Sequence, residues 1–176
     1  MNKIKQLPLV LAAVWMIIQL LLFNFNVSHH FRTGAFFNIF FILAVVVLSM
    51  YLQIREEKKL YPFATNFKNS LKQAGKYIVL VGIFLFIYLK FINPQFLEKF
   101  RELRIEMALN EDFEKVQKSF PQYETFEDYK EQVYESSKII SSPTLIISFY
   151  FLFLFLVSIV FSIGVPLFYK KVVLRM

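Results

Sequence analysis

The chain has 176 residues, of which 57% are hydrophobic and 19% aromatic, and it carries 23 phenylalanines, no cysteine and a formal net charge of +7. Without cysteine it has neither a disulfide framework nor a thiolate metal site, and a soluble domain of this length does not need so much apolar surface. Such a charge could indicate nucleic-acid binding in a soluble protein, but in a membrane protein it reflects basic residues kept on cytoplasmic loops. We therefore expect no nucleic-acid partner.

Four apolar runs dominate the sequence, at about residues 7–25, 35–54, 77–92 and 144–168. A run of about 20 apolar residues is long enough to cross the hydrocarbon core of a bilayer as a helix. The first run is longer than the apolar region of a secretory signal, and no small-residue cleavage site follows it, so we expect an uncleaved span. The sequence predicts an all-α integral membrane protein with four transmembrane helices in a single membrane domain, residues 1–176.

A basic segment, residues 55–76, separates the second and third spans. Its apolar residues from Leu60 to Ala74 recur at helical spacing on one face, and lysines follow another face. Two readings stay open, an amphipathic helix in the headgroup layer or a cytoplasmic extension of the third span. The lysines are candidates for contact with anionic lipid, where each basic residue gains about 1 kcal/mol, although ordinary positive-inside bias would also place them there. These residues are Lys58, Lys59, Lys68, Lys72 and Lys76.

A long polar excursion, residues 93–143, separates the third and fourth spans. The pair Asn93-Pro94 should end or bend the third helix, because proline pushes the preceding residue out of the α region. Two helical patterns follow, with a break expected near Asn110 and an end at Pro121. Thr125 and Asp128 have the spacing of a capping box, which predicts a second helix at about residues 126–139. The excursion should therefore form a helical hairpin.

The distribution of charge predicts how the chain is threaded. Lysine and arginine gather at the N-terminus, in segment 55–76 and after the fourth span, whereas acidic residues outnumber basic ones in the excursion. Basic residues close to the spans mark the cytoplasmic side. We therefore expect a multi-pass protein of the cytoplasmic (inner) membrane, with both termini in the cytoplasm and the excursion outside.

Polar side chains within the spans are few and uncharged. No Asp, Glu, Lys or Arg lies deep in an apolar run, whereas proton relays and ion paths generally need such groups. We expect the polar residues to make contacts between helices, worth about 0.5–2 kcal/mol for each hydrogen bond. The candidates for helix–helix contact are Gln19, Asn38, Ser158 and Ser162.

No motif indicates catalysis or a bound cofactor. His29 and His30 are the two histidines of the chain, and zinc generally takes three or four ligands, so we expect no metal. A phosphate-binding loop, a zinc-protease histidine pair and a dinucleotide fingerprint are all absent from the sequence. We expect a protein that is not an enzyme.

Two stretches carry a resemblance to a known family. The first is Phe91-Ile92-Asn93-Pro94-Gln95-Phe96-Leu97-Glu98, and the second is the aromatic amphipathic stretch from Phe63 to Lys72. With the four spans, they resemble the domain of unknown function 4199 family of uncharacterised integral membrane proteins from Bacteroidota. The chain departs from the family at Tyr61-Pro62, where glycines are common. The resemblance implies the four-span architecture and a bacterial inner membrane, and it implies no activity.

We interpret the chain as a non-enzymatic accessory or scaffold protein. Residues 93–143 would bind a membrane-protein partner or complete a homo-oligomer. The alternative is an oligomeric subunit for permeation of a small molecule or ion, in which the polar residues of the spans would face one another or a cavity. A third reading, an enzyme acting on lipid-linked substrates, would rest only on Glu98 and Glu102 near the membrane surface.

Overall fold

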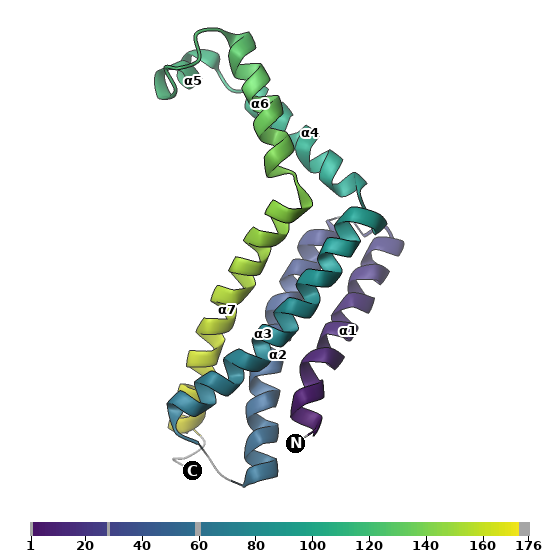
Figure 1. The fold of residues 1–176 in the computed structure, drawn as a ribbon, viewed down its shortest axis with the longest axis vertical. Coiled ribbons are helices and arrows are strands. Elements are labelled where there is room, and N and C mark those ends of the chain that lie inside the picture. Colours follow the sequence, from purple (N-terminus) through teal and green to yellow (C-terminus); the bar gives the residue numbers. More distant parts are fainter. Residues whose placement is uncertain (1, 28, 59–60, 173–176) are drawn as a thin grey trace. The chain divides into compact units, whose positions relative to one another are not determined.

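A computed structural model describes residues 2–27, 29–58 and 61–172. Within these ranges the chain is all α, with no β-strand, and it has one short π-helical segment (Figure 1). The prediction of an all-α protein is therefore confirmed. The elements are α1 (Asn2–Asn24), α2 (His30–Glu57), α3 (Phe63–Ile87), η1 (Tyr88–Ile92), α4 (Gln95–Leu109), α5 (Phe113–Ser119), α6 (Phe126–Ile140) and α7 (Pro143–Val172).

The chain divides into two compact units. The bundle unit comprises Met1–Phe84 and Tyr150–Met176, and the hairpin unit comprises Leu85–Phe149. The bundle unit holds α1, α2 and most of α3 and α7, whereas the hairpin unit holds η1 and α4 to α6 with the adjoining ends of α3 and α7.

Four helices are long and apolar enough to cross a membrane, at Ile4–Asn24, His30–Glu57, Phe63–Ile92 and Pro143–Lys171. Their lengths of 21 to 30 residues correspond to about 30–45 Å of helix, enough for the hydrocarbon core. These helices correspond to the four predicted spans, and α1 ends one residue before the predicted end at residue 25. They extend beyond the apolar runs because polar residues continue a helix until a capping or helix-ending residue stops it.

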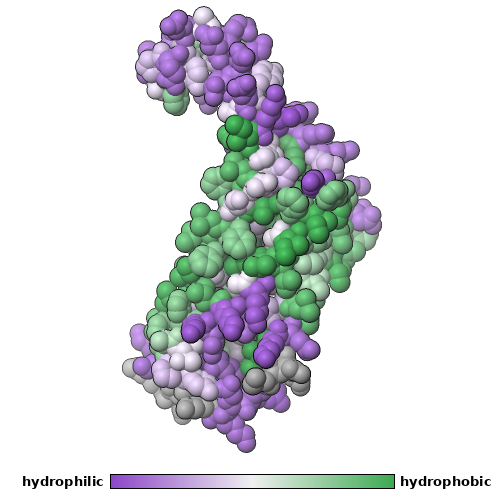
Figure 2. Space-filling view, in the orientation of Figure 1, coloured by the Kyte–Doolittle hydropathy of each residue, from purple (hydrophilic) through white to green (hydrophobic). Residues whose placement is uncertain are grey.

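The surface of the bundle unit is apolar where lipid would contact it. Side chains such as Leu9, Ile17, Leu156 and Val160 are exposed on its helices. Figure 2 shows this apolar surface in green and the mainly polar surface of the hairpin unit in purple. Soluble monomers rarely expose apolar patches of this extent, so the surface agrees with a membrane location.

The basic segment between the second and third spans is divided between two helices. Arg55 lies in the last turn of α2, and residues from Phe63 onward belong to α3, which passes Gly75 without a break. The segment from Phe63 onward is thus helical and continuous with the third span, as both readings of the sequence expect. Residues 58–62 separate the two helices, and Lys59 and Leu60 among them lie outside the described residues.

The core of the bundle unit is built around aromatic and branched side chains. Trp15 of α1 meets Phe84 of α3 edge to face, with 5.7 Å between ring centroids. Tyr77 and Val81 of α3 and Leu154 of α7 are also almost fully buried. Each of the four helices therefore contributes a buried face, although no helix is buried all round.

The hairpin unit has a small hydrophobic core of its own. Val116 of α5 and Tyr129 and Val133 of α6 are buried, and Ile105, Ala108, Leu109, Phe113 and Tyr123 pack against them. The break predicted near Asn110 is confirmed, because Asn110 caps the C-terminus of α4. Three helical segments from a continuous stretch of sequence thus bury their apolar faces against one another.

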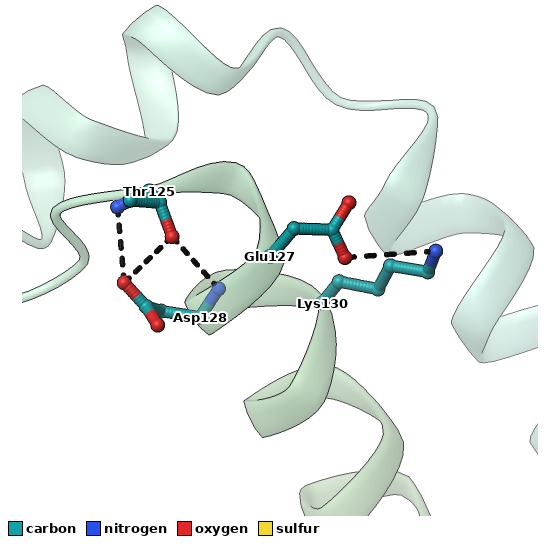
Figure 3. A network of polar contacts seen from close by, with 4 residues as sticks. All are labelled: Thr125, Glu127, Asp128 and Lys130. Atoms are coloured by element: carbon teal, nitrogen blue, oxygen red, sulfur yellow. Dashed lines mark hydrogen bonds and ion pairs between the residues drawn. The ribbon is translucent and has the colours of Figure 1, made fainter.

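The start of α6 has the capping box that the sequence predicts. The backbone N–H of Asp128 donates to Thr125 Oγ1 at 3.2 Å, and the backbone N–H of Thr125 donates to Asp128 Oδ2 at 3.2 Å (Figure 3). Glu127, in the same first turn, forms an exposed ion pair with Lys130 at 3.9 Å. The cap explains why α6 begins at Phe126, because it satisfies donors that a helix start leaves free.

The third span ends in a π-helical turn at Asn93. The backbone N–H of Asn93 donates to the Tyr88 carbonyl at 2.8 Å, a five-residue step, and its Nδ2 donates to the Tyr88 hydroxyl at 3.3 Å. The predicted end at Asn93-Pro94 is confirmed. The wider turn was not predicted, since π-helical turns have no sequence signature as clear as a capping box.

Candidate functional site

A polar contact joins three helices inside the bundle unit. Asn38 of α2 is fully buried, and its Nδ2 donates to the Tyr150 hydroxyl of α7 at 2.7 Å. The Tyr77 hydroxyl of α3 donates to Asn38 Oδ1. In lipid, such groups have few alternative partners, so one asparagine fixes the relative register of α2, α3 and α7.

A second buried polar site lies between α1 and α2. Trp15 Nε1 donates to the Gly34 carbonyl at 2.9 Å. Gln19, one turn along α1, is 1% exposed, and neither its Oε1 nor its Nε2 has a hydrogen-bond partner. A Cβ atom on Gly34 would overlap Gln19 Oε1. The absence of a side chain at Gly34 therefore makes room for the Gln19 amide.

The two serines of α7 are buried but do not bridge helices by hydrogen bonds. Ser158 Oγ donates to the Phe155 carbonyl of its own helix at 2.7 Å, and Ser162 Oγ has no partner. Ser158 and Ser162 lie one turn apart on α7, and neither they nor Gln19 and Asn38 line the pocket described next. The small side chains of Ser158 and Ser162 permit close approach between helices.

A polar pocket of about 150 Å³ lies where the first turns of α1, the last turns of α2 and the first turns of α3 meet. Its wall combines hydroxyl and amide side chains with two lysines, one carboxylate and two apolar residues. Gln53 of α2 accepts a hydrogen bond from Asn69 Nδ2 of α3 at 3.2 Å. The lining residues are Ile4, Lys5, Ser49, Met50, Gln53, Glu57, Asn69, Ser70, Lys72 and Gln73.

The lysines proposed for contact with lipid fall in different places. Lys72 is exposed and lines the pocket. Lys58, Lys68 and Lys76 are also exposed, and Lys76 Nζ donates to Gln73 Oε1 at 3.4 Å. Lys59 lies outside the described residues. The structure thus brings one of the predicted lysines, Lys72, to a concave polar site.

The hairpin unit presents an apolar face away from its core. Leu103 and Met107 of α4 are 54% and 64% exposed, and Phe96 and Phe100 stack one turn apart on the same side, with 6.3 Å between ring centroids. We call these four residues the α4 stripe. Arg104 borders it, with its guanidinium 5.8 Å from the Phe100 ring centroid.

In the part of the chain that the structure describes, no group of three or more histidine, aspartate or glutamate side chains is placed to hold a metal ion. His29 occupies the N-cap position before α2, with a left-handed backbone at φ 61°.

The comparison with protein families covers nearly the whole chain. A family model described as "Protein of unknown function (DUF4199)" matches residues 8–171. The chain belongs to the DUF4199 family. The DUF4199 match includes most of the first candidate span, the other three spans and the entire hairpin unit. No curated protein and no solved structure matches the chain.

Sequence reasoning missed the pocket and the partners of Asn38. Tyr77 and Tyr150 look like ordinary aromatic residues of apolar spans, and nothing local pairs them with a residue far away in sequence. The sequence does contain a pattern from which part of the pocket could have been predicted. Ser49 and Gln53 are four residues apart on α2, and Ser70 and Gln73 are three apart on α3, so each pair shares a helix face.

Proposed function

We propose that this protein is a non-enzymatic accessory protein of the cytoplasmic membrane, with both termini in the cytoplasm and the hairpin unit outside. Its role is to bind another membrane or envelope protein through the α4 stripe. The threading rests on the basic residues near the N-terminus, the loop after α2 and the end of α7. The binding role rests on the geometry of α4.

The observation that carries the proposal is that α4 has two apolar faces and the hairpin core uses only one. Ile105, Ala108 and Leu109 pack on that core. At about 100° per residue, the centre of the α4 stripe lies roughly 160° around the helix from them. The stripe therefore cannot contribute to the same core, and two of its side chains are more than half exposed.

The net charge of the hairpin unit favours a different protein as the partner over an anionic bilayer surface or a second copy of the chain. Acidic residues outnumber basic ones in residues 93–143, so a bilayer surface rich in anionic lipid would repel this unit. Two copies of the unit would repel each other for the same reason. We therefore expect a different protein, whose apolar groove or helix face receives the α4 stripe and carries an acidic side chain that can meet Arg104 at its border.

Site-specific photo-crosslinking in native membranes tests this proposal. A photoreactive residue at Met107 should give one discrete protein adduct, and Leu103→Gln should reduce it at least about tenfold, as expected for a central apolar contact. The matched positions are Glu131 and Glu135 on α6, which are exposed but lie outside the α4 stripe. Photoreactive residues there should give no such adduct.

Three results would contradict the proposal. Labelling of lipid alone from Met107 would place the α4 stripe on the bilayer. An adduct of twice the mass of the chain would make the partner a second copy. Equal adducts from α4 and α6 would mean that the stripe is not the contact surface.

A further inference from the structure

The pocket between α1, α2 and α3 is unusual because its polar side chains are themselves buried. Ser49, Gln53, Ser70 and Gln73 are each more than nine-tenths buried. Burying an amide or hydroxyl without a hydrogen bond costs free energy. Apolar residues would fill the space between membrane helices without that cost, so the polar lining needs another explanation.

Among the described residues, the Ser49 hydroxyl of the pocket lining has no hydrogen-bond partner. Ser49 Oγ is buried without a hydrogen bond, and it lies one turn from Gln53 on the same wall of the pocket. Buried polar groups are nearly always paired, and exceptions indicate a bound molecule or a functional role. Ser49 Oγ has almost no exposed surface, so a rotation of the side chain about χ1 would turn it toward a bound molecule.

The charged residues of the lining indicate what such a ligand carries. Lys5 and Lys72 supply two cations and Glu57 supplies one anion, so the site is net positive. Lysine ammonium groups bind phosphate as point charges, and basic pockets between transmembrane helices suit phosphorylated headgroups. A volume of about 150 Å³ is far below the roughly 300–1,000 Å³ of sites for drug-sized ligands. It suits a small polar group.

We propose that this pocket binds a phosphate ester. Lys5 and Lys72 contact the phosphate. The hydroxyl of Ser49 and the amides of Gln53 and Asn69 contact the polar substituent of the ester. Ile4 and Met50 supply the apolar part of the wall, against which a glycerol or similar carbon skeleton can lie. The ester can come from a phospholipid headgroup or from a free metabolite. This site is separate from the α4 stripe, so each can fail without the other.

The chain offers a matched control for the charge. Lys68 lies on α3 one turn before Lys72 and is also exposed, but it does not line the pocket. If general attraction to an anionic membrane were the whole effect, Lys68→Gln and Lys72→Gln would weaken binding equally. If the pocket is the site, only Lys72→Gln and Lys5→Gln should do so.

The test uses the full chain purified in a sugar-based detergent without phospholipid. Native mass spectrometry then counts bound molecules after addition of phosphatidylglycerol, and separately of glycerol phosphate. We expect one bound molecule per chain, weakened about tenfold by Lys5→Gln or Lys72→Gln, as for loss of one charge-assisted contact, and unchanged by Lys68→Gln. Ser49→Ala should weaken binding without changing the charge.

The two additions distinguish the source of the phosphate. Binding of phosphatidylglycerol alone assigns a lipid headgroup, and binding of glycerol phosphate as well assigns a soluble ester. Equal binding by wild type, Lys72→Gln and Lys68→Gln would overturn the proposal, as would no binding of either compound. Thermal unfolding of each ligand-free variant, expected to match that of wild type, shows that lost binding does not come from lost folding.

Discussion

At the residue scale, the packing of the Gln19 side chain depends on the absence of a side chain at Gly34. Because a Cβ atom at Gly34 would overlap Gln19 Oε1, Gly34→Ala should destabilise the bundle unit by about 1–3 kcal/mol, as overpacking does. Shortening the neighbour in Gln19→Ala should remove most of that penalty in the double variant. The measurement is a double-mutant cycle by denaturant unfolding in detergent. Gly75→Ala is the control, because nothing lies near that position. Additive effects of the two changes would contradict this account.

Asn38 is a second single residue on which stability depends, because its hydrogen bonds join three helices. Asn38→Ala leaves the hydroxyls of Tyr77 and Tyr150 without the partner that they share. The expected loss is about 1–3 kcal/mol of unfolding free energy, the cost of unsatisfied buried polar groups. Ser158→Ala is the matched control, since its hydroxyl bonds only within α7, and it should cost less than about 1 kcal/mol. Equal losses of unfolding free energy in the two variants would mean that the contact joining three helices stabilises the protein no more than a hydroxyl bonded within one helix.

At the element scale, the hairpin unit should weaken in alkali. Tyr129 Oη donates to the Ala108 carbonyl at 3.1 Å, and burial, with the charge of Glu111 second, raises the pKa of Tyr129 above its usual 10.0. A raised pKa in the folded state favours folding below the unfolded value, and that stability is lost as the pH rises through the folded value.

Proteolysis of α6 in the reconstituted protein should therefore accelerate as the pH rises above about 10. Tyr129→Phe should be cut faster at neutral pH, because it lacks the bond to Ala108, but its rate should depend less on alkaline pH. The rate of cutting is compared at each pH with that of an added soluble standard protein, to correct for the protease. An identical pH dependence in both proteins would contradict the role given to Tyr129.

The elements also show how far the sequence predicts the structure. The capping box at Thr125, the break at Asn110 and the end at Asn93 depend on residues within one or two turns, so local chemistry is enough to find them. The contact of Asn38 with Tyr150 spans 112 residues and depends on which helix faces meet. The pocket was missed because it depends on which faces of α1, α2 and α3 meet, and no local pattern around Gln53 or Gln73 shows that.

At the scale of the whole molecule, the account depends on which side of the membrane each part occupies. The partner-binding role requires the hairpin unit outside, and the basic loop after α2 inside. The sequence has no cysteine, so a single introduced cysteine can report on each position without background labelling. Gln122 in the hairpin unit and Arg55 at the end of α2 are both exposed, which makes them suitable sites.

The decisive measurement is labelling of Gln122→Cys and Arg55→Cys in intact cells with a membrane-impermeant maleimide. We predict that Gln122→Cys is labelled in intact cells and that Arg55→Cys is labelled only after the membrane is permeabilised. Leu156→Cys, on the exposed apolar face of α7, should resist labelling in both conditions. Labelling of Arg55→Cys but not Gln122→Cys in intact cells would reverse the threading and contradict the proposed role of the hairpin unit.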